Sequence, residues 1–278
     1  MEILIADSGA TKTDWAIVEN GKPVFIKGAG LHPAYLSEDE IKEEINRTVG
    51  SQNPSFVRFF GAGCFQGDGR KRIRRALESQ FGKVVSEIDD DLTGAAKGLL
   101  SKQNGIICAL GTGSACGRYQ NGKITNRSAS LGFAIGDEGS AAHMGKLILK
   151  RYFRNQFRSD TTDIVKEALN SSDYSELMEK IYSGSSPAKK LGEIAGLILK
   201  DDLTTDLKDL VQESIASFFT EQFSALNPQQ DEKVVFTGSI SKSHSDIILQ
   251  IFKEYGYSNT EIGGSVIEGL SIHFGGVK

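Results

Sequence analysis

The sequence has few of the residues that mark several common protein classes. Only three of its 278 residues are cysteine, and without a C-x-x-C pair they exclude a disulfide framework and fit a reducing compartment. The four histidines show no metal-ligand spacing, so no structural zinc site is expected. No run of about 18 apolar residues occurs, which excludes a membrane span, and no basic segment followed by an apolar run opens the chain. We therefore expect a cytoplasmic protein.

The sequence also lacks a large excess of charge of either sign. Thirty-two Lys and Arg balance 36 Asp and Glu, a formal charge of −4, so no overall field favours nucleic acid or an anionic membrane. The basic run from Arg70 to Arg75 has no interleaved aromatic residues, and we interpret it as the solvated face of a helix. Neither a nucleic acid nor a membrane is expected as a partner.

Several nucleotide and hydrolase motifs are absent. No G-x-x-x-x-G-K-[ST] motif occurs, which excludes a P-loop. The Gly111-x-Gly113 and Gly61-x-Gly63 pairs lack the third glycine of a dinucleotide-binding turn. Ser114 and Ser140 lack a G-x-S-x-G context, so a hydrolase nucleophile is not expected.

Glycine, in contrast, is abundant, with 31 residues against 5 prolines. The length suggests about two domains. Apolar strand patterns alternate with amphipathic helix patterns, which predicts an α/β fold with ligands at the carboxyl ends of the strands. The strands are expected at Glu2–Ala6, Asp14–Glu19, Val24–Lys27, Phe56–Phe60, Val84–Ile88, Gly105–Leu110 and Lys233–Thr237.

A weak internal repeat divides the chain. Residues 11–13 and 20–22 (TKT and NGK) are echoed 101 residues later by residues 112–114 and 121–123 (TGS and NGK). Each copy follows an apolar strand, and Asn-Gly is the pair that a tight hairpin turn requires. The repeat predicts two related α/β halves, each opening with a hairpin. The boundaries expected are 1–109 for the first domain and 110–262 for the second, with a final helix at about 263–278 returning to the first.

Five glycine-containing turns follow apolar strands. Backbone N–H groups and hydroxyls in such turns can bind phosphate oxygens, although a single turn of this kind is more often only a turn. The turns are Asp7–Thr13, Gly61–Gly63, Gly111–Ser114, Gly136–Ser140 and Thr237–Ser239.

Three groups of acidic residues are candidates for chemistry. Asp7 ends the first strand, where it could bind Mg²⁺ or simply form a turn. One residue of Asp89–Asp91 should cap the helix that follows, while another could face a ligand as a base or metal ligand. Asp137 and Glu138 precede a helix, whose N-terminus favours negative charge in any case. The residues alone leave these alternatives open.

The ordered motifs resemble those of the sugar kinase, actin and chaperone ATPase superfamily. They are similar in particular to its N-acetylglucosamine kinase and BadF/BadG-type ATPase branch. The resemblance covers most of the chain outside residues 155–225 and is carried by D-x-G-x-T-K-T at Asp7–Thr13, L-G-T-G-S at Leu110–Ser114, G-D-E-G-S at Gly136–Ser140 and T-G-S at Thr237–Ser239. It implies two ribonuclease-H-like domains, of the actin-like ATPase type, flanking an interdomain cleft.

The resemblance also implies roles for individual residues. Asp91 matches the catalytic base and Asp7 the Mg²⁺-associated carboxylate. The residues matching the ATP-binding motifs are Gly9, Thr11, Lys12, Thr13, Gly111, Thr112, Gly113, Gly238 and Ser239. The residues matching the sugar contacts are His32, Gly63, Asp91, Ser114, Gly132, Phe133, Asp137 and Glu138.

Two functions share this fold. The first is an ATP- and Mg²⁺-dependent kinase that phosphorylates an amino sugar, with N-acetylglucosamine and its 6-hydroxyl as the favoured substrate and position. We expect this kinase to be a homodimer. The alternative is an ATP-hydrolysing activator of the BadF/BadG type that acts on a partner enzyme, although Cys64 and Cys116 are not obviously placed for an iron–sulfur cluster. A binding protein without turnover is the third interpretation. His32 stands where the kinases carry Asn, which bears on which sugar is bound.

Overall fold

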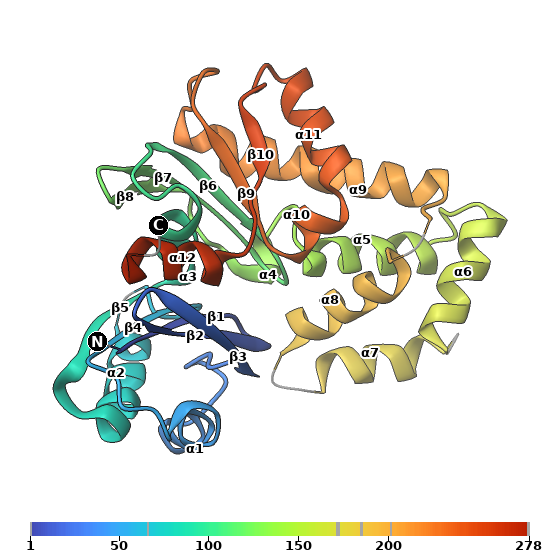
Figure 1. Cartoon of the computed structure of the whole chain (residues 1–278). Coiled ribbons are helices and arrows are strands. Elements are labelled where there is room, and N and C mark those ends of the chain that lie inside the picture. The colour runs from blue at the N-terminus through green and yellow to red at the C-terminus, as the bar shows by residue number, and fades with distance from the viewer. Residues whose placement is uncertain (1, 66, 171–172, 184–185, 201, 277–278) are drawn as a thin grey trace. The chain divides into compact units, whose positions relative to one another are not determined.

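The computed structural model describes residues 2–65, 67–170, 173–183, 186–200 and 202–276 (Figure 1). The chain forms two compact units, each with its own sheet. Unit 1 comprises Met1–Asn104, Tyr119–Ile124 and Gly263–Lys278, and unit 2 comprises Gly105–Arg118 and Thr125–Ile262. The domain boundaries at 109/110 and 262/263 stay a prediction, and residues 277–278 of the expected last helix lie outside the described residues.

Unit 1 contains a five-stranded mixed sheet in the order β3-β2-β1-β4-β5. Strands β1, β4 and β5 are parallel, and β2 is antiparallel to both β1 and β3. The turn between β2 and β3 has positive φ at both Asn20 and Gly21, as the Asn-Gly pair predicts. The strands are β1 (Glu2–Ser8), β2 (Lys12–Glu19), β3 (Lys22–Ala29), β4 (Phe56–Gly61) and β5 (Val85–Asp89).

Helices cover both faces of this sheet. Helices α1 (Glu38–Val49) and α2 (Asp68–Phe81), with the short turn η1 (Gly82–Val84), pack on one face. Helices α3 (Asp91–Leu99) and α12 (Val266–Gly275) pack together, and α12 contacts β1 and β2 on the other face. The two faces follow from the period of two along each strand, which sends alternate apolar side chains to opposite sides.

The crossing of α3 and α12 depends on glycine. A Cβ on Gly269 would lie 2.1 Å from the carbonyl oxygen of Gly98, and a Cβ on Gly98 would lie 2.7 Å from the carbonyl oxygen of Val266. Backbone atoms cannot move aside as a flexible side chain can, so this contact requires glycine on both helices. It brings α12 close enough to bury Ile267 and Leu270 against the sheet.

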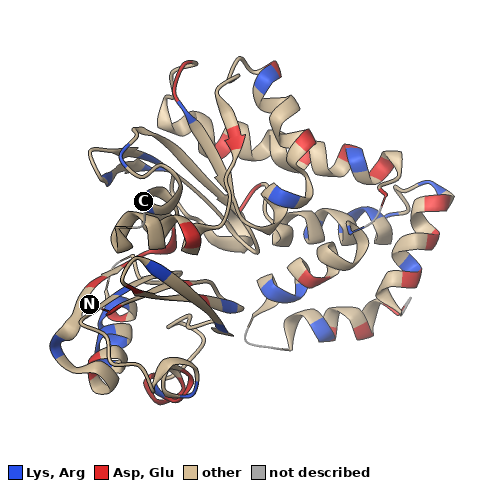
Figure 2. Cartoon of the chain, viewed as in Figure 1, with Lys and Arg blue, Asp and Glu red and all other residues tan. Residues whose placement is uncertain are grey.

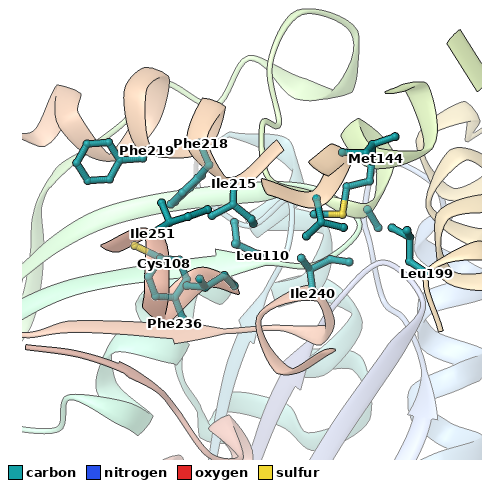
Figure 3. Close-up of a cluster of buried hydrophobic side chains, with 14 of the residues drawn as sticks. Cys108, Leu110, Met144, Leu199, Ile215, Phe218, Phe219, Phe236, Ile240 and Ile251 are labelled. Carbon is teal, nitrogen blue, oxygen red and sulfur yellow. The ribbon is translucent and has the colours of Figure 1, made fainter. Parts of the chain in front are cut away.

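The second sheet has the order β10-β9-β6-β7-β8, with β6, β9 and β10 parallel. Phe236, Leu110 and Ile215 meet in the core of unit 2 (Figure 3). With this sheet the α/β class predicted from the sequence is confirmed. The strands are β6 (Gly105–Leu110), β7 (Ser114–Gln120), β8 (Lys123–Arg127), β9 (Val234–Thr237) and β10 (Thr260–Ile262). The helices are α4 (Gly132–Ile135), α5 (Ala141–Phe153), α6 (Ser159–Leu169), α7 (Tyr174–Tyr182), α8 (Pro187–Ile198), α9 (Thr205–Phe218), α10 (Ser239–Ser243) and α11 (Ser245–Glu254).

The helical segment that begins at Thr205 changes type toward its end. Helix α9 ends at Phe218 and continues as a π-helical turn, η2 (Phe219–Phe223), and then as a 3₁₀ turn, η3 (Ser224–Leu226). The wider π turn allows Phe219, Gln222 and Phe223 to be buried together. Of the helices in the described part of the chain, none has both the length and the hydropathy needed to cross a bilayer.

Candidate functional site

Acidic residues line the carboxyl edge of the sheet in unit 1. Asp7 pairs directly with Asp14 across the antiparallel strands β1 and β2, so their side chains project from the same face. On the other side, Asp7 is in register with Phe60, and Phe60 with Asp89. The register therefore directs the side chains of Asp7 and Asp14 to one face at this edge, while the Asp89 carboxylate pairs with Arg70 of α2. The sequence did not reveal the pairing of Asp7 with Asp14.

Helix α3 adds further carboxylates at this edge of the sheet. Asp90 caps the helix, accepting a hydrogen bond from Thr93 N at 2.9 Å, which confirms the prediction that one of the three aspartates is the cap. Asp91 is the first residue of the helix and only partly buried. Burial, together with the negative charges of Asp91 and Asp14, raises the pKa of Asp7 to about 7. The charges of Asp7 and Asp91 therefore interact, and the raised pKa favours a proton on Asp7.

The turn after β1 is held by buried hydroxyls. Gly9 N donates to Lys12 O at 2.9 Å, and the Thr13 hydroxyl donates to Ala29 O at 2.8 Å. Because the Thr13 hydrogen is used in this way, Ser8 Oγ must be the donor in its 2.8 Å contact with Thr13 Oγ1. Thr11 and Lys12 are exposed at the tip. Thr13 therefore stabilises the turn from within, while Lys12 pairs with Asp14 at 2.6 Å and Thr11 stays exposed.

The segment at residues 30–33 packs against this turn. A Cβ on Gly30 would lie 2.5 Å from the carbonyl carbon of Ala10, so only glycine fits there. Gly63, with φ +78°, brings its backbone against the imidazole of His32, 3.0 Å from the position of a Cβ. Two of the predicted sugar contacts, His32 and Gly63, therefore lie together beside the predicted phosphate turn.

His32 has a defined tautomer in its neutral form. Its Nδ1 accepts a hydrogen bond from Ala34 N at 3.2 Å, so the ring proton lies on Nε2. Burial lowers the pKa of His32, which favours this neutral form. The ring stacks on Tyr35 with centroids 4.4 Å apart. His32 thus presents an N–H donor, as an asparagine amide would at the same position.

Basic residues recur along α2, which is coloured by charge in Figure 2. The contacts of two of its arginines correct the interpretation of the basic run as a solvated face. Arg70 donates to the carbonyl oxygens of Cys64 at 2.9 Å and Phe65 at 3.0 Å, and pairs with Asp89 at 2.5 Å. Arg72 donates to the carbonyl oxygens of Pro33 at 2.6 Å and Leu36 at 3.0 Å. The two guanidinium groups therefore hold the loops that carry Gly63 and His32. Lys71, between them, is exposed as predicted.

In unit 2, the turn between β6 and β7 rests on the start of α5. Ala141 N donates to Gly111 O at 2.9 Å, and Ala142 N donates to Thr112 O at 3.1 Å. A Cβ on Gly113 would lie 3.1 Å from the Asp137 carboxylate. The predicted phosphate turn and the acidic pair before α5 are therefore adjacent.

The turn after β9 meets the same edge. Gly238 has φ +103°, and a Cβ there would lie 2.2 Å from the carbonyl oxygen of Leu110. Ser239, next to it, is exposed and begins α10. The predicted adenosine motif thus lies at the end of β6, where the phosphate turn begins.

The loop with Gly132 and Phe133 is attached to α5 by a lysine. Lys146 donates to the carbonyl oxygen of Phe133. The pKa of Lys146 is lowered overall, because desolvation lowers it more than the nearby carboxylates of Asp137 and Glu138 raise it. Burial raises the pKa of Asp137, whose carboxylate accepts a hydrogen bond from the Ser114 backbone. The predicted sugar contacts of unit 2 therefore form one connected polar cluster.

Sequence reasoning missed Gln222, which joins this cluster from the π turn. Its amide nitrogen donates to Ser114 Oγ at 2.7 Å and to Glu138 Oε2 at 2.8 Å. The only signal in the sequence is a polar residue among the apolar positions Phe218, Phe219 and Phe223.

The carboxylates of unit 1 suit a magnesium ion that arrives with phosphate groups. Among the described residues no group of three or more His, Cys, Asp and Glu side chains forms a metal site, so a fully protein-enclosed ion is not indicated. Mg²⁺ usually takes only one or two carboxylates and completes its shell with phosphates and water. Asp7, whose pKa is raised by burial and, to a smaller extent, by the neighbouring carboxylates of Asp91 and Asp14, fits such an ion because a bound cation stabilises the charged form of a carboxylate.

Comparison with known proteins finds relatives named as kinases of amino sugars and also a structural neighbour of another kind. This neighbour, component A of the (R)-2-hydroxyglutaryl-CoA dehydratase from Acidaminococcus fermentans, is 13% identical with a TM-score of 0.54, covers 98% of this chain and 95% of that chain, and supports the fold alone. No protein-family model matches the chain. An N-acetylmuramic acid/N-acetylglucosamine kinase from Clostridium acetobutylicum is 28% identical over 168 residues, which cover 56% of this chain and 53% of that protein. The matched region thus spans about half the length of that curated relative.

Two solved structures are similar over almost the whole chain. A proposed N-acetylglucosamine kinase from Porphyromonas gingivalis is 27% identical, with a TM-score of 0.90 and 99% of both chains covered. A second proposed N-acetylglucosamine kinase, from Chromobacterium violaceum, is 19% identical with a TM-score of 0.75 and 98% of both chains covered, and it supports the fold alone. The resemblance to the N-acetylglucosamine kinase branch expected from the sequence is confirmed.

Proposed function

We propose that this protein is an ATP-dependent carbohydrate kinase that phosphorylates an N-acetylated amino sugar, with N-acetylglucosamine at its 6-hydroxyl as the leading substrate. The observation that carries the proposal is the pair Asp7 and Asp91 beside the turn at residues 9–12 and the segment with His32. A general base, a phosphate turn and a sugar loop are the parts that such a transfer requires. The names of the relatives support the same class of enzyme.

In the proposed reaction, Asp91 accepts the proton of the sugar hydroxyl as its oxygen attacks the γ-phosphorus. The new O–P bond forms while the bond from the γ-phosphorus to the bridging oxygen breaks, and ADP leaves with that electron pair. Phosphoryl transfer depends mainly on positioning and charge neutralisation. Asp7 would hold Mg²⁺, which when bound neutralises phosphate charge.

The turns at residues 9–13 and 111–114 each bind phosphate oxygens in this proposal, and Gly238 and Ser239 bind the adenosine. At Gly30 and Gly238 a side chain would collide with the neighbouring backbone. This packing supports turns in which glycine lets the backbone approach its surroundings closely. The sugar contacts are His32 and Gly63 in unit 1 and the Ser114, Gly132, Phe133, Asp137 and Glu138 cluster in unit 2.

The alternative, an activator ATPase with an iron–sulfur cluster, finds no support in the cysteines. Cys64, Cys108 and Cys116 are each at most 1% exposed. Burial, with Asp91 nearby, raises the pKa of the Cys64 thiol to about 12, whereas iron–sulfur clusters are held by thiolates. The third interpretation, a binding protein without turnover, gives no role to the interacting carboxylates of Asp7 and Asp91. The expected homodimer stays a prediction.

The assay that tests the proposal measures sugar-dependent ADP release with Mg²⁺ and ATP. We expect N-acetylglucosamine or N-acetylmuramic acid to give a kcat/KM at least about tenfold above glucose, with a phosphomonoester at carbon 6 in the product. ADP release that no sugar stimulates would contradict the kinase. A visible iron chromophore after anaerobic purification would instead favour the activator.

Arg70 offers a second test, because it fixes the loop that carries Gly63. Arg70→Met removes two hydrogen bonds to that loop and the ion pair with Asp89. We expect the KM for the sugar to rise about tenfold or more, since a small misplacement of binding groups is costly, while the KM for ATP changes little. Steady-state kinetics at varied sugar and at varied ATP separate the two. Lys71→Met, at the exposed neighbouring position, is the matched control, and an equal effect there would contradict the role of Arg70.

A further inference from the structure

Gln222 is a buried polar residue that bridges two members of the proposed sugar site. It is 5% exposed and sits in the π turn that follows α9. Its Nε2 donates one hydrogen to Ser114 Oγ at 2.7 Å and the other to Glu138 Oε2 at 2.8 Å. Ser114 begins β7, and Glu138 precedes α5, so one amide group connects three separate segments of unit 2.

The chemistry of the neighbours fixes the orientation of this amide. The Glu138 carboxylate oxygen accepts a hydrogen bond from Gln222 Nε2, so the nitrogen of Gln222 faces it and the oxygen points away. In this orientation both amide hydrogens are used. The oxygen, Oε1, is then buried without a hydrogen-bond partner.

An unpaired buried carbonyl oxygen costs free energy that a methionine or leucine at the same position would not. Burial of the residue among Phe219 and Phe223 also requires the π turn, an arrangement common at functional sites. Helix geometry and core packing therefore give no reason for an amide at this position. The contacts with Ser114 and Glu138 do.

We infer that Gln222 is a positioning residue for sugar recognition, which holds the Ser114 hydroxyl and the Glu138 carboxylate in fixed orientations. Because Ser114 Oγ accepts from Gln222, its own hydrogen remains to be donated, and Glu138 keeps its second oxygen as an acceptor. The pair thus offers one donor and one acceptor, the combination that an acetamido group or a ring hydroxyl requires. This inference rests on the proposed kinase function.

The test compares Gln222→Met with Gln222→Glu. Methionine has a similar volume and no amide, so both hydrogen bonds are lost while the unpaired oxygen is removed. We expect the KM for N-acetylglucosamine to rise about tenfold or more, the KM for ATP to stay within about twofold, and the melting temperature not to fall. Gln222→Glu places a carboxylate against Glu138, and we expect it to raise the sugar KM further.

The exposed Gln212 of the preceding helix α9 provides the control variant Gln212→Met, which should match the wild type. If Gln222→Met melts much earlier and changes both KM values alike, the residue is structural and the inference is wrong. An unchanged sugar KM in Gln222→Met also overturns it, even if Gln222→Glu fails to fold. Failure of the wild type to phosphorylate any sugar would instead contradict the proposed function.

Discussion

Asp91→Asn is expected to lower kcat by about 10²- to 10⁴-fold, the usual contribution of a general base, while sugar and ATP still bind. The amide cannot accept the proton of the sugar hydroxyl. It can still accept the hydrogen bond that Asp91 Oδ1 receives from Leu92 N at 3.0 Å, so the start of α3 is retained. Rapid-quench or coupled measurement of kcat, with sugar affinity from calorimetry in the presence of ADP, separates catalysis from binding.

The neighbouring residue provides a closely matched control. Asp90 undergoes the same chemical change in Asp90→Asn, but its side chain caps the helix, and asparagine caps a helix about as well as aspartate. Asp90→Asn should therefore keep kcat within a few-fold of the wild type. A kcat for Asp91→Asn within tenfold of the wild type, or an equal loss in Asp90→Asn, would show that Asp91 is not the base.

Asp7→Asn is expected to have the second large effect, and its effect on the free energy of unfolding depends on pH. Because the pKa of Asp7 is raised from 3.8 to about 7 in the folded protein, the folded state binds the proton more tightly than the unfolded state does. The associated stability is present below pH 4 and is lost as the pH rises through 7. At about 1.4 kcal/mol per pKa unit, the free energy of unfolding falls by at most about 4 kcal/mol across this range.

Asparagine removes this dependence. Without nucleotide at pH 8, Asp7→Asn should therefore melt several degrees above the wild type, yet its kcat should fall because a ligand for Mg²⁺ is lost. Addition of Mg²⁺ to the ADP-saturated protein should raise the melting temperature of the wild type more than that of Asp7→Asn. Asp68→Asn, an exposed change of the same kind, should alter none of these quantities. Equal melting temperatures of Asp7→Asn and the wild type at pH 8 would contradict the raised pKa of Asp7.

Features set by neighbours in the sequence could be predicted. Ser37 and Glu40 form a capping box at the start of α1, which the S-x-x-E pattern alone predicts because a cap involves only the residues of one turn. The Asn20-Gly21 turn depends on local backbone preference in the same way. The alternation of strands and helices gave the fold class.

Contacts between distant segments could not be predicted in this way. Asp14 lies opposite Asp7 only because β1 and β2 pair in that register, and Arg70 reaches Asp89 only because α2 packs beside β5. The burial of Gln222 could not be predicted for a different reason. A π turn adds a residue to the helix, so the helical period that predicts burial is broken where Gln222 lies.

The glycine contact between α3 and α12 has a consequence for how the protein is made. A nascent chain emerges from the ribosome N-terminus first. Helix α12 comes last, yet its residues Ile267 and Leu270 cover Ile5, Ala16 and Phe60 of strands β1, β2 and β4. Unit 1 therefore keeps an apolar face of its sheet exposed until the roughly 160 residues between Asn104 and Gly263 have been translated. A nascent chain halted before residue 266 carries both sheets and lacks the cover of the first.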